Sequence, residues 1–117
     1  MACDARAGVR GLNARRGQVW YVAPDLPTVG AEIRKDRPCL VVQPPEMDFL
    51  RTTIVAPLSG RGFAAPFRVP TKFGKSRFVL LDHLRAIDRS RLRRYAGDLD
   101  DAELAAVLGA LQAIFAP

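Results

Sequence analysis

Four charged side chains that could act on a phosphate lie within six positions of the sequence: Glu32, Arg34, Lys35 and Arg37. Arg37 stands immediately before an apolar run that starts at Pro38, so a buried strand is expected to hold its guanidinium in place. A guanidinium offers two parallel donors to phosphoryl oxygens. Such charge runs are more commonly solvated loops with internal ion pairs, so this cluster is not specific alone.

Ser59 follows the next strong apolar run and supplies a hydroxyl at a strand exit. Serine at such a position is usually a turn residue. The hydroxyl could also donate to the same phosphoryl oxygens as Arg37. Neither residue is specific alone.

His83 is the only histidine, and its ordinary pKa near neutrality would suit proton transfer. It has no second histidine beside it and follows an apolar strand, so a structural role is favoured. The two cysteines, Cys3 and Cys39, form no Cys-x-x-Cys pair, and Cys39 lies within an apolar run. No zinc ligand set results, so the predicted site holds neither metal nor cofactor.

The composition is that of one globular domain, with 117 residues, 49% of them hydrophobic and 26% charged. No apolar run approaches the roughly 20 residues of a membrane span, and the N-terminus has no secretory h-region. We therefore expect a cytoplasmic protein. Residues 1–14 show no hydrophobic period and are expected to form a mobile leader to a domain over 15–117.

Charge is distributed unevenly along the chain. The net charge is +6 and the pI is about 10.1. All eighteen Lys and Arg residues precede residue 95, while residues 95–117 contain four acids and no base. Arginine predominates among the bases and suits bidentate phosphate contacts. A nucleic acid is a reasonable partner, although arginine from a GC-rich genome on an ordinary surface would give the same count.

Short strands, a long loop over 24–36 and one helix are predicted to position these side chains. The expected strands are Gln18–Ala23, Pro38–Gln43, Thr52–Leu58, Pro66–Pro70 as an edge strand, Arg77–Asp82 and Tyr95–Leu99. The basic run Arg89–Arg94 is interpreted as a solvated face. This order predicts a mainly β fold, a small curved antiparallel sheet or barrel that ends in a helix.

The helix is predicted from three-and-four spacing. Its apolar face is expected to carry Leu104, Val107, Leu108, Leu111, Ile114 and Phe115. Asp100 is placed as the N-cap, with Glu103 three residues on in a capping pattern. The opposite face is rich in alanine. Such a face would allow another element or a second subunit to approach closely, or it could simply be exposed to solvent.

Several segments, in order, resemble the MazF/PemK toxins. Arg16–Trp20 is similar to the family's opening RGDVW, Gly30–Glu32 with Arg37–Pro38 and Val41–Val42 to its GxE…RPxxVV, and Thr53–Ser59 to its TxIVAPLT. Pro66–Val69, Val79–Arg85, Ile87–Asp88 and the closing helix occupy the remaining landmarks. Each motif is weak alone, but their order and spacing over residues 15–117 are specific.

The resemblance implies an SH3-like curved antiparallel barrel with a C-terminal helix, and a homodimer inhibited by a cognate antitoxin protein. It further implies metal-independent, sequence-specific cleavage of single-stranded RNA to 2′,3′-cyclic phosphate and 5′-hydroxyl ends. The family's catalytic arginine falls on Arg37, its threonine on Ser59 and its motif glutamate on Glu32. Many members of the family have a glutamine directly after a Leu-Asp pair, and this chain has His83 at that position.

The chemistry of the residues is compatible with that expectation. Arg37 is a poor general base, because deprotonating a guanidinium at pH 7 costs about 7 kcal/mol. We therefore expect Arg37 to stabilise the transition state, Ser59 to assist, and Glu32 to orient Arg37 or accept the proton.

RNA binding is assigned to five residues in loops and strand ends: Arg34, Lys35, Arg61, Phe63 and Arg85. Phe63 is one of three loop phenylalanines that could stack on a base. Two rival interpretations remain at this stage, a gyrase-inhibiting toxin of the CcdB type and a non-catalytic RNA-binding barrel.

Overall fold

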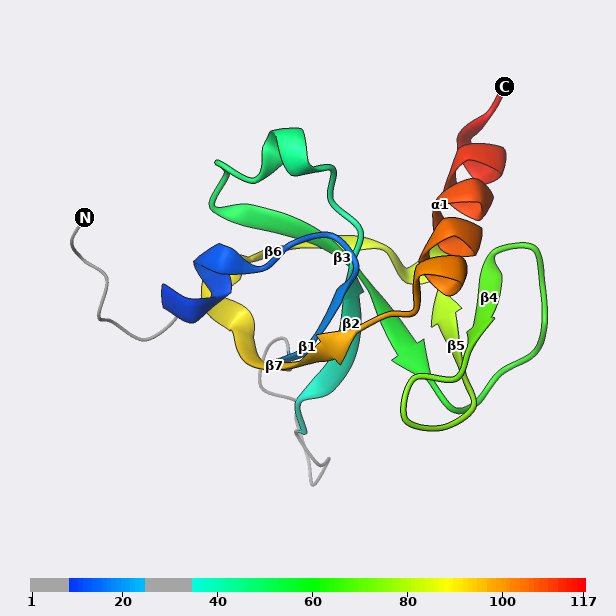
Figure 1. Ribbon diagram of the computed structural model, residues 1–117, viewed down its shortest axis with the longest axis horizontal. Helices are drawn as coiled ribbons and strands as arrows, with labels where there is room; N and C mark the ends of the chain where they lie inside the picture. Colours follow the sequence, from blue (N-terminus) through cyan, green and yellow to red (C-terminus); the bar gives the residue numbers. More distant parts are fainter. Residues whose placement is uncertain (1–8, 25–34) are drawn as a thin grey trace.

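A computed structural model describes residues 9–24 and 35–117 of the chain (Figure 1). Seven strands are followed by a single long helix. The strands are β1 (Gln18–Val22), β2 (Arg37–Val41), β3 (Thr52–Ser59), β4 (Arg68–Thr71), β5 (Arg77–Leu80), β6 (Arg85–Asp88) and β7 (Leu92–Asp98), and the helix is α1 (Asp101–Phe115). Short 3-10 helices are η1 (Val9–Asn13), η2 (Pro45–Met47), η3 (Leu81–His83) and η4 (Arg89–Arg91).

The strands form one antiparallel sheet in the order β4-β5-β3-β2-β1-β7. β6 lies off this path and pairs with β3. β3 therefore has two partners on one edge: Thr52–Val55 pair with β6, and Leu58–Ser59 pair with β5. The prediction of a mainly β fold with a C-terminal helix is confirmed, but the sheet is not closed into a barrel. Its outer strands in the described residues are β4 and β7.

Two hydrophobic clusters lie on opposite faces of the central strands. One is enclosed by β1, β2, β3, β6 and β7, and includes Trp20, Cys39, Val55 and Leu92. The other includes Val19, Leu40 and Ala56 and is covered by α1. This alternation is the period of two expected of strands that are buried on both faces.

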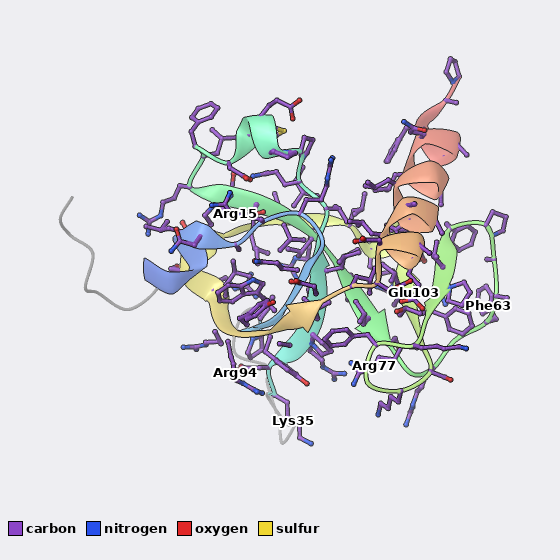
Figure 2. All side chains as sticks on the ribbon, viewed as in Figure 1. Arg15, Lys35, Phe63, Arg77, Arg94 and Glu103 are labelled. Atoms are coloured by element: carbon purple, nitrogen blue, oxygen red, sulfur yellow. The ribbon has the colours of Figure 1, made fainter. Side chains whose placement is uncertain are left out.

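Helix α1 begins as predicted, because the Asp100 carboxylate accepts a hydrogen bond from the Glu103 amide at 3.4 Å. The Glu103 carboxylate reaches β4 instead of the N-cap. Its oxygens accept from the Thr71 hydroxyl at 2.6 Å and from the Lys72 amide at 2.9 Å (Figure 2). Val107 is fully buried, whereas Phe115, expected on the apolar face, is 72% exposed.

η1 (Val9–Asn13) lies within the segment that was expected to be a mobile leader, and it packs against η4. Gly11 permits that approach, because a Cβ there would lie 2.3 Å from the Arg89 carbonyl oxygen. Arg89 is fully buried and donates to the carbonyls of Gly11, Ala14 and Leu50.

The burial of Arg89 also corrects the interpretation of Arg89–Arg94 as a solvated face. Leu92 of this run is buried as well, and β7 begins there, three residues earlier than predicted. β6 was not predicted as a strand. Only Ile87 of its four residues is buried, which is too little for a hydrophobic period.

Candidate nuclease site

An open cavity of about 650 Å³ lies where β1, β2, β3 and β5 end or begin. It is lined by Tyr21, Lys35, Asp36, Arg37, Pro38, Leu58, Ser59, Gly60, Arg61, Lys75 and Arg77. The volume falls within the range of small-ligand pockets. The structure thus brings the arginine and the hydroxyl predicted from the sequence to one cavity.

The register of the sheet explains why Arg37 and Ser59 meet. Cys39 lies opposite Pro57 in the β2–β3 pair, and continuing this antiparallel register outward sets Arg37 opposite Ser59. Arg37 is exposed at the first position of β2, whereas Leu40 and Val41 behind it are fully buried. A rigid core therefore carries a solvent-facing guanidinium.

Ser59 is half-buried, and its Oγ accepts a hydrogen bond from the Arg61 amide at 3.1 Å. This contact stabilises the turn after β3, as expected of a serine at a strand exit. A hydroxyl that accepts one bond keeps its own proton free to donate. The turn role and a role as donor to a ligand are therefore compatible.

The cavity is strongly basic. Among the described residues, five cations line it, namely Lys35, Arg37, Arg61, Lys75 and Arg77, against one acid, Asp36. Within residues 9–24 and 35–117, none of the five forms a salt bridge. Unpaired cations around a concave surface attract anions from a distance. The site is therefore suited to a polyanion.

Of the predicted RNA-binding residues, Lys35 and Arg61 line this cavity. Phe63 does not. It is 59% exposed on the β3–β4 connection, and Figure 2 shows it at the right of the view, whereas Lys35 lies at the bottom. The Arg68 guanidinium lies 4.4 Å from the centre of its ring. Arg85 is exposed on β6, opposite Val55, and is also absent from the cavity lining.

Arg68 is itself held in place by Asp82, to which it donates hydrogen bonds of 3.2 and 2.9 Å. These bonds keep the pKa of the Asp82 carboxyl below its usual range. The Phe63 ring therefore packs against the guanidinium of Arg68, which Asp82 holds in place, and it does not line the cavity. Glu32 and Arg34, the other predicted site residues, lie outside the described residues.

Four polar or charged cavity residues were not predicted as site residues: Tyr21, Asp36, Lys75 and Arg77. Tyr21 is half-buried in β1, and the Arg94 guanidinium stacks over its ring at 4.2 Å. Asp36 is adjacent to Arg37 in sequence, and that adjacency is the only signal that could have indicated it. Arg77 precedes an apolar run, as Arg37 does, and this position is the signal that could have indicated it.

Two reactive residue types, histidine and cysteine, do not line this cavity. His83 is exposed, lies 3.5 Å from Asp82, and does not line the cavity. Cys39 is buried, and its burial raises the pKa of the thiol to about 11, although nearby Arg85 and Arg91 oppose the shift. A thiol held neutral is a poor nucleophile. No cluster of three or more possible metal ligands occurs in the part of the chain that the structure describes.

The chain matches the model of the PemK-like, MazF-like toxins of type II toxin–antitoxin systems over residues 15–115. It therefore belongs to the MazF/PemK toxin family. No curated protein matches it significantly. No described helix is long and apolar enough to cross a membrane.

Solved structures agree with this assignment. A MazE–MazF structure from Deinococcus radiodurans is 30% identical, with a TM-score of 0.71 over 86% of this chain and 94% of that chain. MazF alone from the same organism is 28% identical, with a TM-score of 0.68 over the same shares. An endoribonuclease from a mycobacterial species shares the fold at 20% identity, with a TM-score of 0.68 over 84% and 86% of the two chains.

Proposed function

We propose that this toxin is a metal-independent, sequence-specific endoribonuclease that cleaves single-stranded RNA to 2′,3′-cyclic phosphate and 5′-hydroxyl ends. The observation that carries the proposal is the presence of Arg37 and Ser59 in one cavity lined by five cations. The endoribonuclease and MazF names of the similar structures support the same activity.

In the proposed reaction, the 2′-oxygen of one nucleotide attacks the adjacent phosphorus and the bond from phosphorus to the 5′-oxygen breaks. The 2′-hydroxyl loses its proton to a base, and the leaving 5′-oxygen takes up a proton. Negative charge builds on the phosphoryl oxygens in between. Arg37 stabilises that charge through parallel donors, and the Ser59 hydroxyl adds a third. Glu32 orients Arg37 or accepts the proton.

The RNA strand is bound by the cations that surround the cavity. Lys35 and Arg61 contact phosphates at the cavity, and Arg34 is also assigned to RNA binding. Phe63 offers an exposed ring on which a base could stack, with Arg68 covering one side. Arg85 contributes to longer-range attraction from β6.

The proposal extends to the partners. The toxin acts in the cytoplasm as a homodimer and is inhibited by a cognate antitoxin protein. A mycobacterial endoribonuclease of the same fold has been solved in complex with its cognate antitoxin. The exposed Phe115 and the 39%-exposed Ile114 on α1 supply apolar surface of the kind that subunits bury. Light scattering after gel filtration measures the mass directly.

The activity is tested by incubating the pure protein with a long single-stranded RNA in EDTA. Cleavage that leaves 2′,3′-cyclic phosphate ends supports the proposal, and binding without cleavage contradicts it. Arg37→Ala should abolish cleavage. Arg93→Gln, a change to an exposed arginine of β7 outside the cavity, should leave cleavage unchanged. A Glu32→Gln variant that cuts at the wild-type rate would remove Glu32 from the mechanism.

A further inference from the structure

Arg77 occupies the side of the cavity opposite Arg37. In the sheet order β5-β3-β2, the strand that carries Ser59 lies between the strands that carry the two arginines. Ser59 pairs with Phe78 of β5, so Arg77 is the next residue outward, beside the turn at Gly60. The hydroxyl is therefore flanked by arginine-bearing strands on both sides.

No hydrogen bond or salt bridge to another described residue holds the Arg77 guanidinium in place. Its Nε is buried and has no hydrogen-bond partner among those residues. Within the described residues it forms no salt bridge either. A buried donor without an acceptor is unfavourable. Turning the side chain toward an anion in the cavity would therefore break no hydrogen bond and would relieve that cost.

Lys75 adds a second cation from the same hairpin. The turn before β5 is fixed by a hydrogen bond from the Lys75 amide to the Phe73 carbonyl at 2.7 Å. Gly74 between them has a φ of +72°, which favours glycine, so the turn shape is encoded locally. Lys75 is exposed and lines the cavity with Arg77.

We propose that Arg77, with Lys75 beside it, binds a second phosphate of the RNA, adjacent to the scissile phosphate that Arg37 engages. The inference rests on the proposed function and deepens it. The cavity volume of about 650 Å³ exceeds what one phosphate group fills, so a second part of the strand can occupy the β5 side. The RNA then crosses the ends of β2, β3 and β5 in that order.

A residue that binds a phosphate remote from the broken bond contributes equally to the ground state and the transition state. Its loss should raise KM and leave kcat unchanged. Loss of one phosphate contact to a single strand should also reduce the salt dependence of binding, with a slope of log K against log salt that is shallower by about 0.7. If Arg77 had only a structural role, replacing it in a protein that still folds would change neither the salt slope of RNA binding nor KM.

The test compares Arg77→Gln, Arg77→Lys and, as the matched control, Arg93→Gln. Binding is measured with a mixed-sequence single-stranded RNA that is fully 2′-O-methylated and so lacks the attacking hydroxyl, from 50 to 200 mM salt. Arg77→Gln should bind about 3- to 10-fold more weakly at low salt, with the shallower slope. Arg77→Lys should keep the slope, and Arg93→Gln should follow the wild type. Melting temperatures check that every variant is folded.

A slope for folded Arg77→Gln that equals that of Arg93→Gln overturns the second phosphate site, and so does a loss of kcat with KM unchanged. The two proposals fail separately. If the wild type never cuts RNA but its binding slope depends on Arg77, the nuclease assignment is wrong and the phosphate contact stands. If the wild type cuts RNA and Arg77 makes no difference, only the phosphate contact is wrong.

Discussion

Ser59 is engaged before any ligand arrives, because its oxygen accepts from the Arg61 amide. The hydroxyl proton is thereby directed away from that amide and is available to a phosphoryl oxygen. The family's threonine at this position carries the same hydroxyl with an additional methyl group. The catalytic function is therefore expected to depend on the oxygen and not on the size of the side chain.

Ser59→Ala should lower kcat for RNA cleavage about 100-fold, in the range observed when one donor to a developing oxyanion is removed. Ser59→Thr should cleave at close to the wild-type rate, since it keeps both the acceptor for Arg61 and the donor. Single-turnover cleavage of a labelled RNA measures both variants. An alanine variant as fast as the threonine variant would exclude Ser59 from the chemistry.

Cys39 gives the fold a specific response to alkaline pH. The folded state raises the pKa of its thiol from the ordinary 9.0 to about 11. Between these values the unfolded chain loses the thiol proton first, so stability is intact below pH 9 and declines as pH rises toward 11.

Relative to Cys39→Ala, the wild type should lose about 2 to 3 kcal/mol of unfolding free energy over that interval, at 1.36 kcal/mol per pKa unit. Urea denaturation of both proteins at pH 8, 9, 10 and 11 measures the difference. The alanine variant corrects for other groups that titrate in the same range. Parallel curves for the two proteins would contradict the shifted thiol.

At the scale of residues, Arg37 and Ser59 were predicted as site residues because each stands at the end of a strong strand pattern and matches a motif of the MazF/PemK family. Arg77 was not predicted as part of the site, since a basic residue at the start of a strand is ordinary. What distinguishes Arg77 is a buried Nε without an acceptor, and this depends on neighbours from other strands. No pattern within a single segment contains that information.

At the scale of elements, Arg89 joins three segments that are distant in sequence. Its guanidinium donates to Gly11 and Ala14 beside η1 and to Leu50 after η2, and lies 3.3 Å from the Asp48 carboxylate. Replacing it would leave several buried carbonyl oxygens without donors.

Arg89→Met, which keeps the length of the side chain, should lower the free energy of unfolding by about 3 to 5 kcal/mol. That is a large fraction of the stability of a domain this size. Arg93→Met is the control on an exposed arginine of the neighbouring strand and should change stability by under about 0.5 kcal/mol. Chemical denaturation measures both. A loss under about 1 kcal/mol for Arg89→Met would show that η1 is held by other contacts.

Elements with a continuous apolar run were predicted well, as β2 and β3 illustrate. β6 was not, because only Ile87 is buried, and its position is set by pairing with β3. The same limit applies to Arg89, which lies in an arginine-rich run that suggests a solvated face. Hydrogen bonds to distant carbonyls decide its burial, and periodicity does not report them.

At the scale of the whole molecule, the open sheet is the main departure from the expected barrel. The resemblance and the strand order predicted strong curvature, and the structure adds that β4 and β7 stay on the outside. Closure depends on whether the first and last strands reach one another, which no local pattern determines.

The basic cavity should make RNA binding strongly dependent on salt. If the five lining cations each neutralise one phosphate, the slope of log K against log salt is about −3.5, and affinity falls roughly 100-fold from 50 to 200 mM. Titration of the 2′-O-methylated RNA at four salt concentrations measures the slope. If the slope of log K against log salt is shallower than about −1, most of these cations do not contact RNA phosphates.

The two strands that lie outermost in the sheet of the described residues, β4 and β7, constrain how copies of the toxin can meet. Pro70 in β4 has no amide hydrogen to offer an incoming strand. β7 is irregular in its pairing with β1 and carries the exposed Arg93 and Arg94. Both features oppose the pairing of edge strands from different molecules, which would otherwise build fibres. A concentrated toxin should therefore stay dispersed, and any ordered assembly must form through side-chain surfaces, not through a shared backbone ladder.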